Sequence, residues 1–210
     1  MTKFNLLEKM LDSFSHDERY LKTIKEVSAS RDEPYKYVSD NEKDKILSMD
    51  SLCEDVYEKM REKYTNVAKH SSVDGLHYIK PNKNLKLIFI EFKHVNLGRQ
   101  EVYNKAIDDL KIKLKLKPLE TLNCVFPHLI DKYCKKDKDE INYLLLKAKK
   151  YYFVVYKDIS NNPKPNLHKN LNRDLISVKR LAKYPFEKVY IVDPESFEKI
   201  IKSLENSKSK

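Results

Sequence analysis

The stretch from residue 71 to residue 94, SSVDGLHYIKPNKNLKLIFIEFKH, constrains the fold more than any other part of the chain. Its two halves are rich in Leu, Ile, Phe and Tyr, and the segment Pro-Asn-Lys-Asn at 81–84 between them has the composition of a turn. We therefore expect an antiparallel hairpin. With a loop of two or four residues, symmetric pairing gives partners whose numbers sum to 165, which places Asp74 directly opposite Glu91.

The predicted hairpin brings three ionisable side chains together. Side chains directly across a ladder share a face, with Cβ atoms about 4.5–5.5 Å apart, and Lys93 shares the face of Glu91 because strand side chains alternate. Two facing acids in a strand covered on both faces are destabilising unless positive charge compensates them. Lys93 offsets part of this charge, and a divalent cation such as Mg²⁺ or Mn²⁺ would offset more. The alternative is a hairpin whose acids are solvated or structural.

Apolar periodicity predicts the elements around the hairpin. Before it, we expect helices over 4–14, over 15–27 behind a capping box at Ser15-x-x-Glu18, and over 48–64. After it, we expect a helix over 98–118, although its Leu/Lys alternation also fits a strand, then helices over 118–134 and 139–150 and a strand over 151–158. The end of the chain is expected to form a loop (161–170), a short helix (173–184), a strand (188–193) and a terminal helix (194–205).

This order of elements predicts an α/β (α+β) fold, in which helices flank a central mixed sheet that contains the antiparallel hairpin. The segment 29–45 has no sustained apolar period and is the best candidate for a boundary. We therefore divide the chain into an N-terminal helical extension with its connection (1–45) and an α/β domain (46–210).

The composition fits a globular protein with a highly charged surface. The 42 lysines and arginines exceed the 32 acids, and the resulting net charge of +10 favours polyanionic partners such as nucleic acid. The longest uncharged run, at 121–130, is far shorter than the roughly 20 apolar residues of a spanning helix, so we expect a cytoplasmic protein without a membrane partner. With only two glycines, a glycine-rich phosphate loop is not expected. The three cysteines have no metal-site spacing and are expected to be reduced.

The layout resembles the PD-(D/E)XK nuclease superfamily, with its restriction-endonuclease-like core, over roughly residues 48–158. Val73 and Asp74 stand where that family has its PD motif, with Val in place of Pro, and Glu91-Phe92-Lys93 stands where it has (D/E)XK. The resemblance implies that Asp74, Glu91 and the backbone carbonyl of Phe92 bind one or two Mg²⁺ or Mn²⁺ ions. It also implies that Lys93 orients or activates the attacking water in a nuclease that hydrolyses the phosphodiester bonds of DNA, with RNA left open as a substrate.

Two further positions follow from the resemblance. Many members of the superfamily use a glutamate on the preceding helix, and here Glu54, Glu58 and Glu62 follow one another at intervals of one turn. We choose Glu58, for which a solvated helix face is the alternative. Gln100 resembles a glutamine that several branches place beside the site, and an ordinary exposed position is its alternative.

The basic surface is rich in lysine, with 36 lysines and 6 arginines. Lysine contacts phosphate as a point charge, whereas bidentate guanine recognition usually takes arginine, so we expect backbone contacts to dominate. The expected phosphate contacts are Arg99, Lys169, Arg173, Lys179, Arg180 and Lys183. A solvated basic face is the alternative for each of them.

Two other functions stay open. The chain is then either an inactive nucleic-acid-binding or assembly protein on the same fold, or a helical interaction module whose hairpin acids are incidental. The apolar stripe Phe4, Leu7, Leu11 and Phe14 would suit a homodimer surface, although packing onto its own domain is the simpler interpretation. We expect surface or core roles for His77, His94 and His168.

Overall fold

The structure, a computed structural model, describes residues 4–30, 36–63, 71–80, 85–98, 100–160 and 165–207, and of these it leaves the side chains at 59, 60, 62, 63, 100, 102, 103, 105, 106 and 165–169 undescribed. The strands in the described residues are β1 (Leu21–Thr23), β2 (Lys45–Ser48), β3 (Gly75–Ile79), β4 (Lys86–Val95), β5 (Lys149–Asp158) and β6 (Lys188–Val192). The α-helices there are α1 (Asn5–Ser15), α2 (Ile24–Val27), α3 (Met49–Lys63), α4 (Gln100–Glu120), α5 (Phe126–Tyr133), α6 (Lys138–Lys147), α7 (Pro165–Asp174), α8 (Ile176–Lys179) and α9 (Pro194–Asn206). A π-helix (Thr121–Val125) joins α4 to α5, and a 3₁₀-helix (Arg180–Lys183) follows α8.

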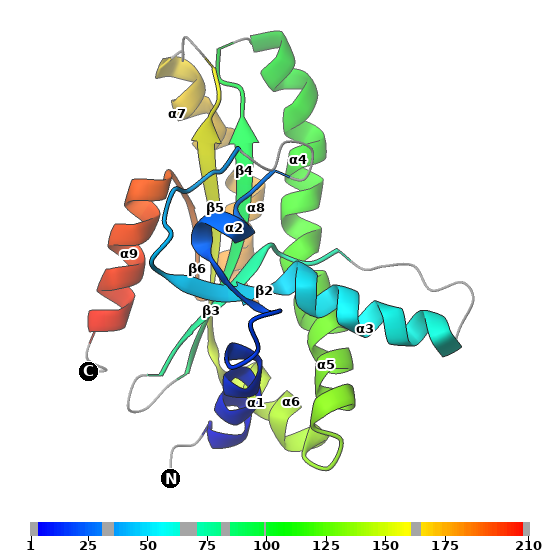
Figure 1. The fold of residues 1–210 in the computed structure, drawn as a ribbon. Coiled ribbons are helices and arrows are strands. Elements are labelled where there is room, and N and C mark those ends of the chain that lie inside the picture. The colour runs from blue at the N-terminus through cyan, green and yellow to red at the C-terminus, as the bar shows by residue number, and fades with distance from the viewer. Residues whose placement is uncertain are drawn as a thin grey trace.

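The strands form one mixed sheet in the order β1-β2-β3-β4-β5-β6. Successive strands from β1 to β4 pair antiparallel, whereas β5 pairs parallel to β4 and β6 parallel to β5. The sheet is strongly twisted, and β2 runs nearly across the direction of β4 and β5 (Figure 1). The predicted fold class, a mixed sheet with an antiparallel hairpin and flanking helices, is confirmed.

Strand β4 lies in the middle of the sheet and is covered on both faces. Leu87 and Phe89 belong to one apolar core, and Ile88, Ile90 and Phe92 belong to a second core on the opposite face. This alternation follows from the two-residue period of a strand. It confirms that β4 is a strand without a solvated face, where an ionised side chain is costly.

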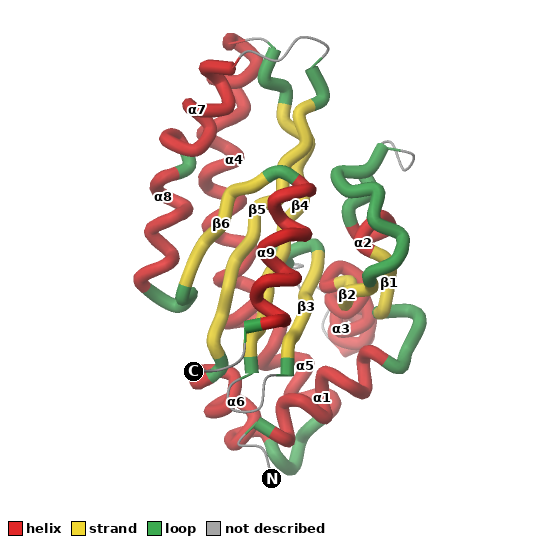
Figure 2. The backbone as a smooth tube through the Cα atoms, turned by 90° about the vertical axis from the view of Figure 1, so that its left-hand side faces the viewer, coloured by secondary structure: helices red, strands yellow, loops and turns green. Residues whose placement is uncertain are grey.

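Different helices cover the two faces. In Figure 1, α9 lies to the left of β4 and β5, and α4 lies to their right. Phe197 of α9 packs with Phe92 and Phe153 in one core, whereas Leu114 of α4 and Val178 of α8 belong to the core that contains Phe89. Figure 2 shows α1 beside α6 at one end of the molecule. A side chain two residues from Phe89 along β4 lies on the same face as Phe89 and therefore points toward α4.

The hairpin has the predicted register. Gly75 pairs with Ile90, Leu76 with Phe89 and Ile79 with Lys86, so that partner numbers sum to 165 throughout. The turn at 81–84 lies outside the described residues. The register is confirmed because the described strands on both sides of that turn keep it.

The prediction of a helix over 15–27 is wrong. Residues 21–23 form β1, which pairs with β2, and only Ile24–Val27 are helical. The capping box that exists is Thr23-x-x-Glu26, in which the N–H of Glu26 donates to the Thr23 hydroxyl and the N–H of Thr23 donates to the Glu26 carboxylate. A three-residue strand is too short to show a sequence period, so its pairing with a distant strand decides its conformation.

The prediction of a loop over 161–170 is wrong from residue 165 onward. Helix α7 begins at Pro165, where proline is tolerated because the N–H it lacks has no partner in the first turn of a helix. The ambiguous stretch 98–118 falls in α4, so the helix that we preferred is confirmed from residue 100. The predicted helix over 118–134 is divided among the end of α4, the π-helix and α5, and the predicted helix over 173–184 among the end of α7, α8 and the 3₁₀-helix. The other predicted helices and strands are present, with ends that differ by a few residues.

The boundary at residue 45 stays a prediction. In the structure, β1 from the first segment pairs with β2 from the second, and Leu7 and Leu11 of α1 are buried in the core that contains Phe89. The stripe Phe4, Leu7, Leu11 and Phe14 therefore packs inside the chain and is not a dimer surface. Cys53, Cys124 and Cys134 form no disulfide bond. Among the described residues, no helix has the length and apolar character needed to cross a membrane.

Candidate active site

Asp74 lies where β3 begins, beside the second half of β4. Gly75, the first residue of β3, pairs with Ile90, so Asp74 comes next to Glu91 and Phe92. The N–H of Phe92 donates to Oδ2 of Asp74 at 2.7 Å. This hydrogen bond holds the carboxylate of Asp74 against the backbone of β4 just beyond the last ladder pair.

Glu91 is the most buried acid of the site. Its side chain is 0% exposed, and it lies on the face of β4 that α4 covers, two residues after Phe89. Its Oε1 contacts the ammonium groups of Lys93 and Lys117, while its Oε2 has no hydrogen-bond partner in the described part of the chain. Burial and the nearby charge of Asp74 raise the pKa of Glu91 to about 7, against the opposing effect of the two lysines.

Lys117, on the last turn of α4, lies between the two acids. Its Nζ is 2.6 Å from Oε1 of Glu91 and 3.1 Å from Oδ1 of Asp74. Although burial lowers it, the charges of Glu91 and Asp74 raise the pKa of Lys117 above its ordinary value. Sequence reasoning missed this residue. Lys117 belongs to a run of alternating Leu and Lys in which no local signal distinguishes one lysine from the next.

Hydrogen bonds hold the backbone on both sides of the acid pair. The hydroxyl of Thr121, a residue that is fully buried, donates to the carbonyl of Lys117 at 2.8 Å and accepts from the N–H of Val73 at 3.0 Å. On the other side, the N–H of Met49 donates to the carbonyl of Asp74 at 3.1 Å. The end of α4 and the beginning of α3 therefore fix the segment that carries Asp74.

The donor atoms fit a divalent cation. A strand residue directs its N–H and its C=O to the same side, so the carbonyl of Phe92 faces the space next to Asp74, as its N–H does. Mg²⁺ usually keeps several waters and binds through one or two carboxylates, which Asp74 and Glu91 supply. The buried Oε2 of Glu91, without a partner among the described residues, would be a further ligand atom. The ammonium of Lys117 lies where a cation between the two carboxylates would lie.

The site is not sealed. The side chains of Lys93 and Lys117 are 26% and 19% exposed, and that of Asp74 is 15% exposed. Water and small ions therefore reach its edge, although Glu91 itself has no exposed surface. A buried carboxylate beside a solvent-accessible ammonium is an arrangement that suits ion binding and proton transfer.

Of the other site residues predicted from the superfamily resemblance, the structure describes the side chain of Glu58. Glu58 is exposed on α3, and the described hydrogen bonds and ion pairs of Asp74 and Glu91 do not include it. Within the described ranges, no three Asp, Glu, His or Cys side chains form a group that would hold a metal ion. Arg99 and the side chains of Glu62, Gln100, His168 and Lys169 lie outside the described residues. The roles of these residues stay predictions.

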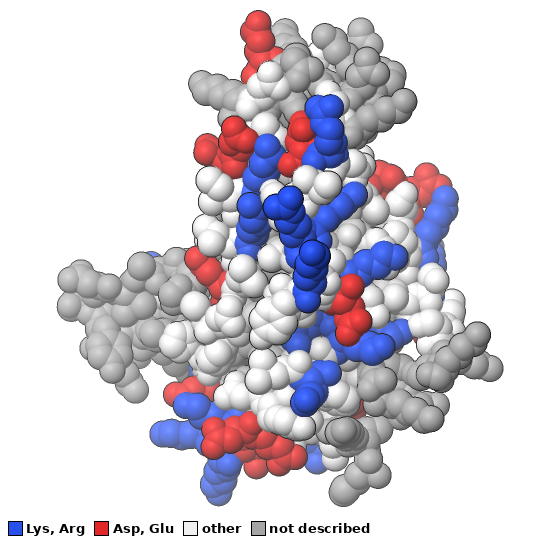
Figure 3. Space-filling view, turned by 180° about the vertical axis from the view of Figure 1, so that it is seen from behind, with Lys and Arg blue, Asp and Glu red and all other residues white. Residues whose placement is uncertain are grey.

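Basic side chains gather on one face of the molecule. Figure 3 shows lysines and arginines running down the middle of the face opposite to the view of Figure 1, with a few acids among them and others nearer the edges. Arg173, Arg180 and Lys183 are exposed, whereas Lys179 is partly buried and donates to Oδ1 of Asn172. Helix α8 lies behind the sheet in Figure 1 and packs in the same core as α4. These basic residues therefore lie on the side of the sheet toward which Glu91 points.

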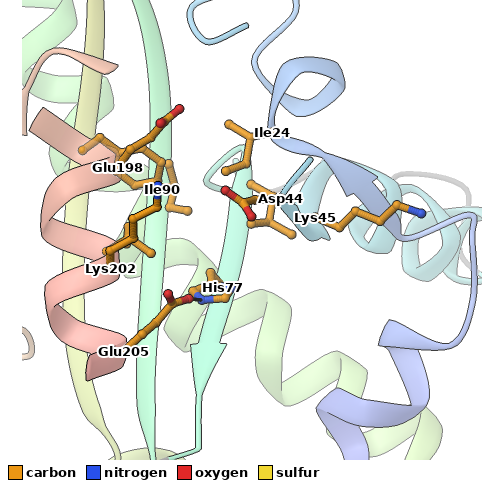
Figure 4. Close-up of a pocket in the computed structure, with 11 residues that line it drawn as sticks. Ile24, Asp44, Lys45, His77, Ile90, Glu198, Lys202 and Glu205 are labelled. Carbon is orange, nitrogen blue, oxygen red and sulfur yellow. Dashed lines mark hydrogen bonds and ion pairs between the residues drawn. The ribbon is translucent and has the colours of Figure 1, made fainter. Parts of the chain in front are cut away.

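A pocket that is partly open to solvent lies on the opposite face of the sheet and is not part of this site. It has a volume of about 130 Å³ and lies between α9, β2 and β3 (Figure 4). Ile90, the neighbour of Glu91, points into it because strand side chains alternate. At its edge His77 contacts Glu205, with 3.1 Å between Nε2 and Oε1, and burial lowers the pKa of His77.

Two acids, two lysines and one strand carbonyl therefore lie together where β3 begins beside β4. Comparison of the chain with protein-family models, with curated proteins and with solved structures finds no significant match.

Proposed function

We propose that the protein is a metal-dependent nuclease that hydrolyses phosphodiester bonds of DNA. The observation that carries this proposal is the meeting of Asp74 and Glu91 at one ammonium group, at 3.1 Å and 2.6 Å, with Lys93 against the same glutamate. Two carboxylates and a lysine at the end of a hairpin are what the resemblance to the PD-(D/E)XK superfamily implies. The net charge of +10 supports a polyanionic substrate.

In this proposal, Asp74, Glu91 and the carbonyl of Phe92 would hold Mg²⁺ or Mn²⁺. A bound metal of this kind lowers the pKa of its water and stabilises the charge that develops on phosphate. The chain's own residues do the positioning. The backbone N–H of Phe92 keeps the Asp74 carboxylate turned toward the site, and the buried position of Glu91 keeps bulk water away from its ligand oxygens.

Lys93 has two tasks in this scheme. Its ammonium lies against Glu91 and is partly exposed, so it meets solvent and substrate at the edge of the site. There it would orient the attacking water and add positive charge where the phosphorane oxygens become more negative. The exposed Arg173, Arg180 and Lys183 would contact phosphates farther along the duplex.

The test is cleavage of plasmid, linear and single-stranded DNA in Mg²⁺ or Mn²⁺ by the wild type, Asp74→Ala and Lys93→Ala. We expect the wild type to cut, and each variant to lose about a hundredfold or more in rate. Lys113→Ala is the matched control, because Lys113 is exposed on α4. Cleavage that survives Asp74→Ala unchanged would refute the proposed site.

A second function is favoured by one observation. Lys117 already supplies a positive charge between the two acids, so the pair is compensated without a metal, as in a nucleic-acid-binding or interaction module that has no chemistry. A wild type that binds DNA without ever cutting it would support that module. A protein that neither binds nor cuts DNA would favour an interaction role.

A further inference from the structure

We propose that Lys117 is an internal cation of the site, which occupies the place of the divalent metal and withdraws when the metal binds. This inference rests on the proposed function, since it concerns the same two carboxylates. It adds a residue outside both motifs and predicts how metal affinity is set.

The contacts of the ammonium support this assignment. Nζ of Lys117 is within hydrogen-bond distance of one oxygen from each acid, at 2.6 Å and 3.1 Å. A metal shared by Asp74 and Glu91 would need the space between the two carboxylates, which this ammonium fills. An ammonium and a divalent cation in this space repel each other, so the two cannot occupy it together.

The surroundings allow the side chain to leave while the helix stays. The carbonyl of Lys117 is held by the hydroxyl of Thr121, so the backbone is fixed, but the side chain is 19% exposed and has a path to solvent. Pro118 follows immediately and supplies no backbone N–H to α4. The π-helix that begins at Thr121 interrupts the regular helix on the next turn, and such segments often occur at functional sites.

Occupation by Lys117 lowers the apparent metal affinity. When only a fraction of molecules has an open site, the apparent dissociation constant is the intrinsic constant divided by that fraction. If the ammonium fills the site in about nine molecules of ten, removing it tightens binding about tenfold. After withdrawal the ammonium remains on α4 beside the site, where a phosphate oxygen is its natural partner.

The test is Mn²⁺ binding by calorimetry to metal-free protein, without any substrate. Lys117→Met removes the ammonium and keeps an unbranched side chain. We expect it to bind Mn²⁺ about tenfold or more tightly than the wild type, and we expect the control Lys113→Met, one turn earlier and exposed on the same helix, to bind like the wild type. Equal affinity of Lys117→Met and wild type overturns the inference but leaves the metal site intact. No Mn²⁺ binding by either protein overturns both the inference and the proposed function.

A second measurement uses only the wild type, in case Lys117→Met does not fold. Reductive methylation followed by mass spectrometry reports how accessible each lysine is. We expect saturating Mn²⁺ to raise the methylation rate of Lys117 several-fold and to leave that of Lys113 unchanged. An unchanged rate at Lys117, under conditions where calorimetry shows bound Mn²⁺, contradicts withdrawal.

Discussion

The buried carboxyl of Glu91 makes the stability of the protein depend on pH, and Glu91→Gln is expected to remove this dependence. Burial and the charge of Asp74 raise the pKa of Glu91 from 4.5 to about 7. Between these values the folded protein keeps a proton that the unfolded chain has lost. The stability that this group contributes is therefore complete below about pH 4.5 and is lost as the pH rises through about 7. One pKa unit corresponds to about 1.4 kcal/mol, so the free energy of unfolding falls by about 3 kcal/mol across this window.

Urea unfolding in EDTA, at about pH 4.5 and about pH 8, measures this difference. The wild type is expected to lose about 3 kcal/mol more between the two conditions than Glu91→Gln. Other titrating groups contribute to both proteins and cancel in the comparison. Glu140→Gln, at an exposed position on α6, should behave like the wild type. Equal pH dependence of the wild type and Glu91→Gln would show that Lys93 and Lys117 keep Glu91 ionised throughout, which refutes the reasoning from burial.

Three further substitutions test the packing around the site by urea denaturation. Gly75→Ala would bring a Cβ to 2.5 Å from Cδ1 of Ile46, so we expect a loss of about 1–3 kcal/mol that is partly recovered in Gly75→Ala/Ile46→Val; a single variant as stable as the wild type contradicts the contact. Thr121→Val leaves the N–H of Val73 without its acceptor and should cost about 1–3 kcal/mol, whereas an unchanged midpoint would mean that this N–H finds another partner. Tyr152→Phe removes a buried hydroxyl that has no partner among the described residues, so stability should stay equal or rise by up to about 1 kcal/mol; a clear loss would reveal a hydrogen bond of that hydroxyl.

The hairpin was predictable because its information is local. The turn composition at 81–84 and the alternation in both strands fix which residues face one another, and the observed pairing of Gly75 with Ile90 follows this rule. The meeting of Asp74 with β4 follows from the same register. Strand β4 also shows in its sequence that both faces are buried, since apolar residues occupy consecutive positions.

Lys117 was not predictable, because its place in the site depends on how α4 packs against the sheet. The side chain comes from a helix that begins after the hairpin, and Thr121 on the next turn sets its backbone against Val73. The short strands were not predicted from the sequence for a related reason. The strands β1 and β2 have three and four residues, so neither shows a periodic pattern, and pairing between Leu21 and Leu47 defines them.

The cations that neutralise the negative charges of Asp74 and Glu91 also differ in how far the local sequence reveals them. Sequence reasoning identified the need for positive charge at Asp74 and Glu91 and proposed Lys93 with a metal. The structure adds a second ammonium from α4. A buried carboxylate attracts whatever cation the fold can deliver, and only the packing of the helix reveals that a lysine of this chain reaches it.

Anomalous diffraction from crystals of the wild type soaked in Mn²⁺ tests most directly whether the acid pair is a metal site. We predict a manganese peak at bonding distance from oxygens of both Asp74 and Glu91, with Nζ of Lys117 turned away from them. The absence of a manganese peak between these carboxylates at saturating Mn²⁺, with Lys117 still bridging them, would contradict the proposal that the acid pair is a metal site.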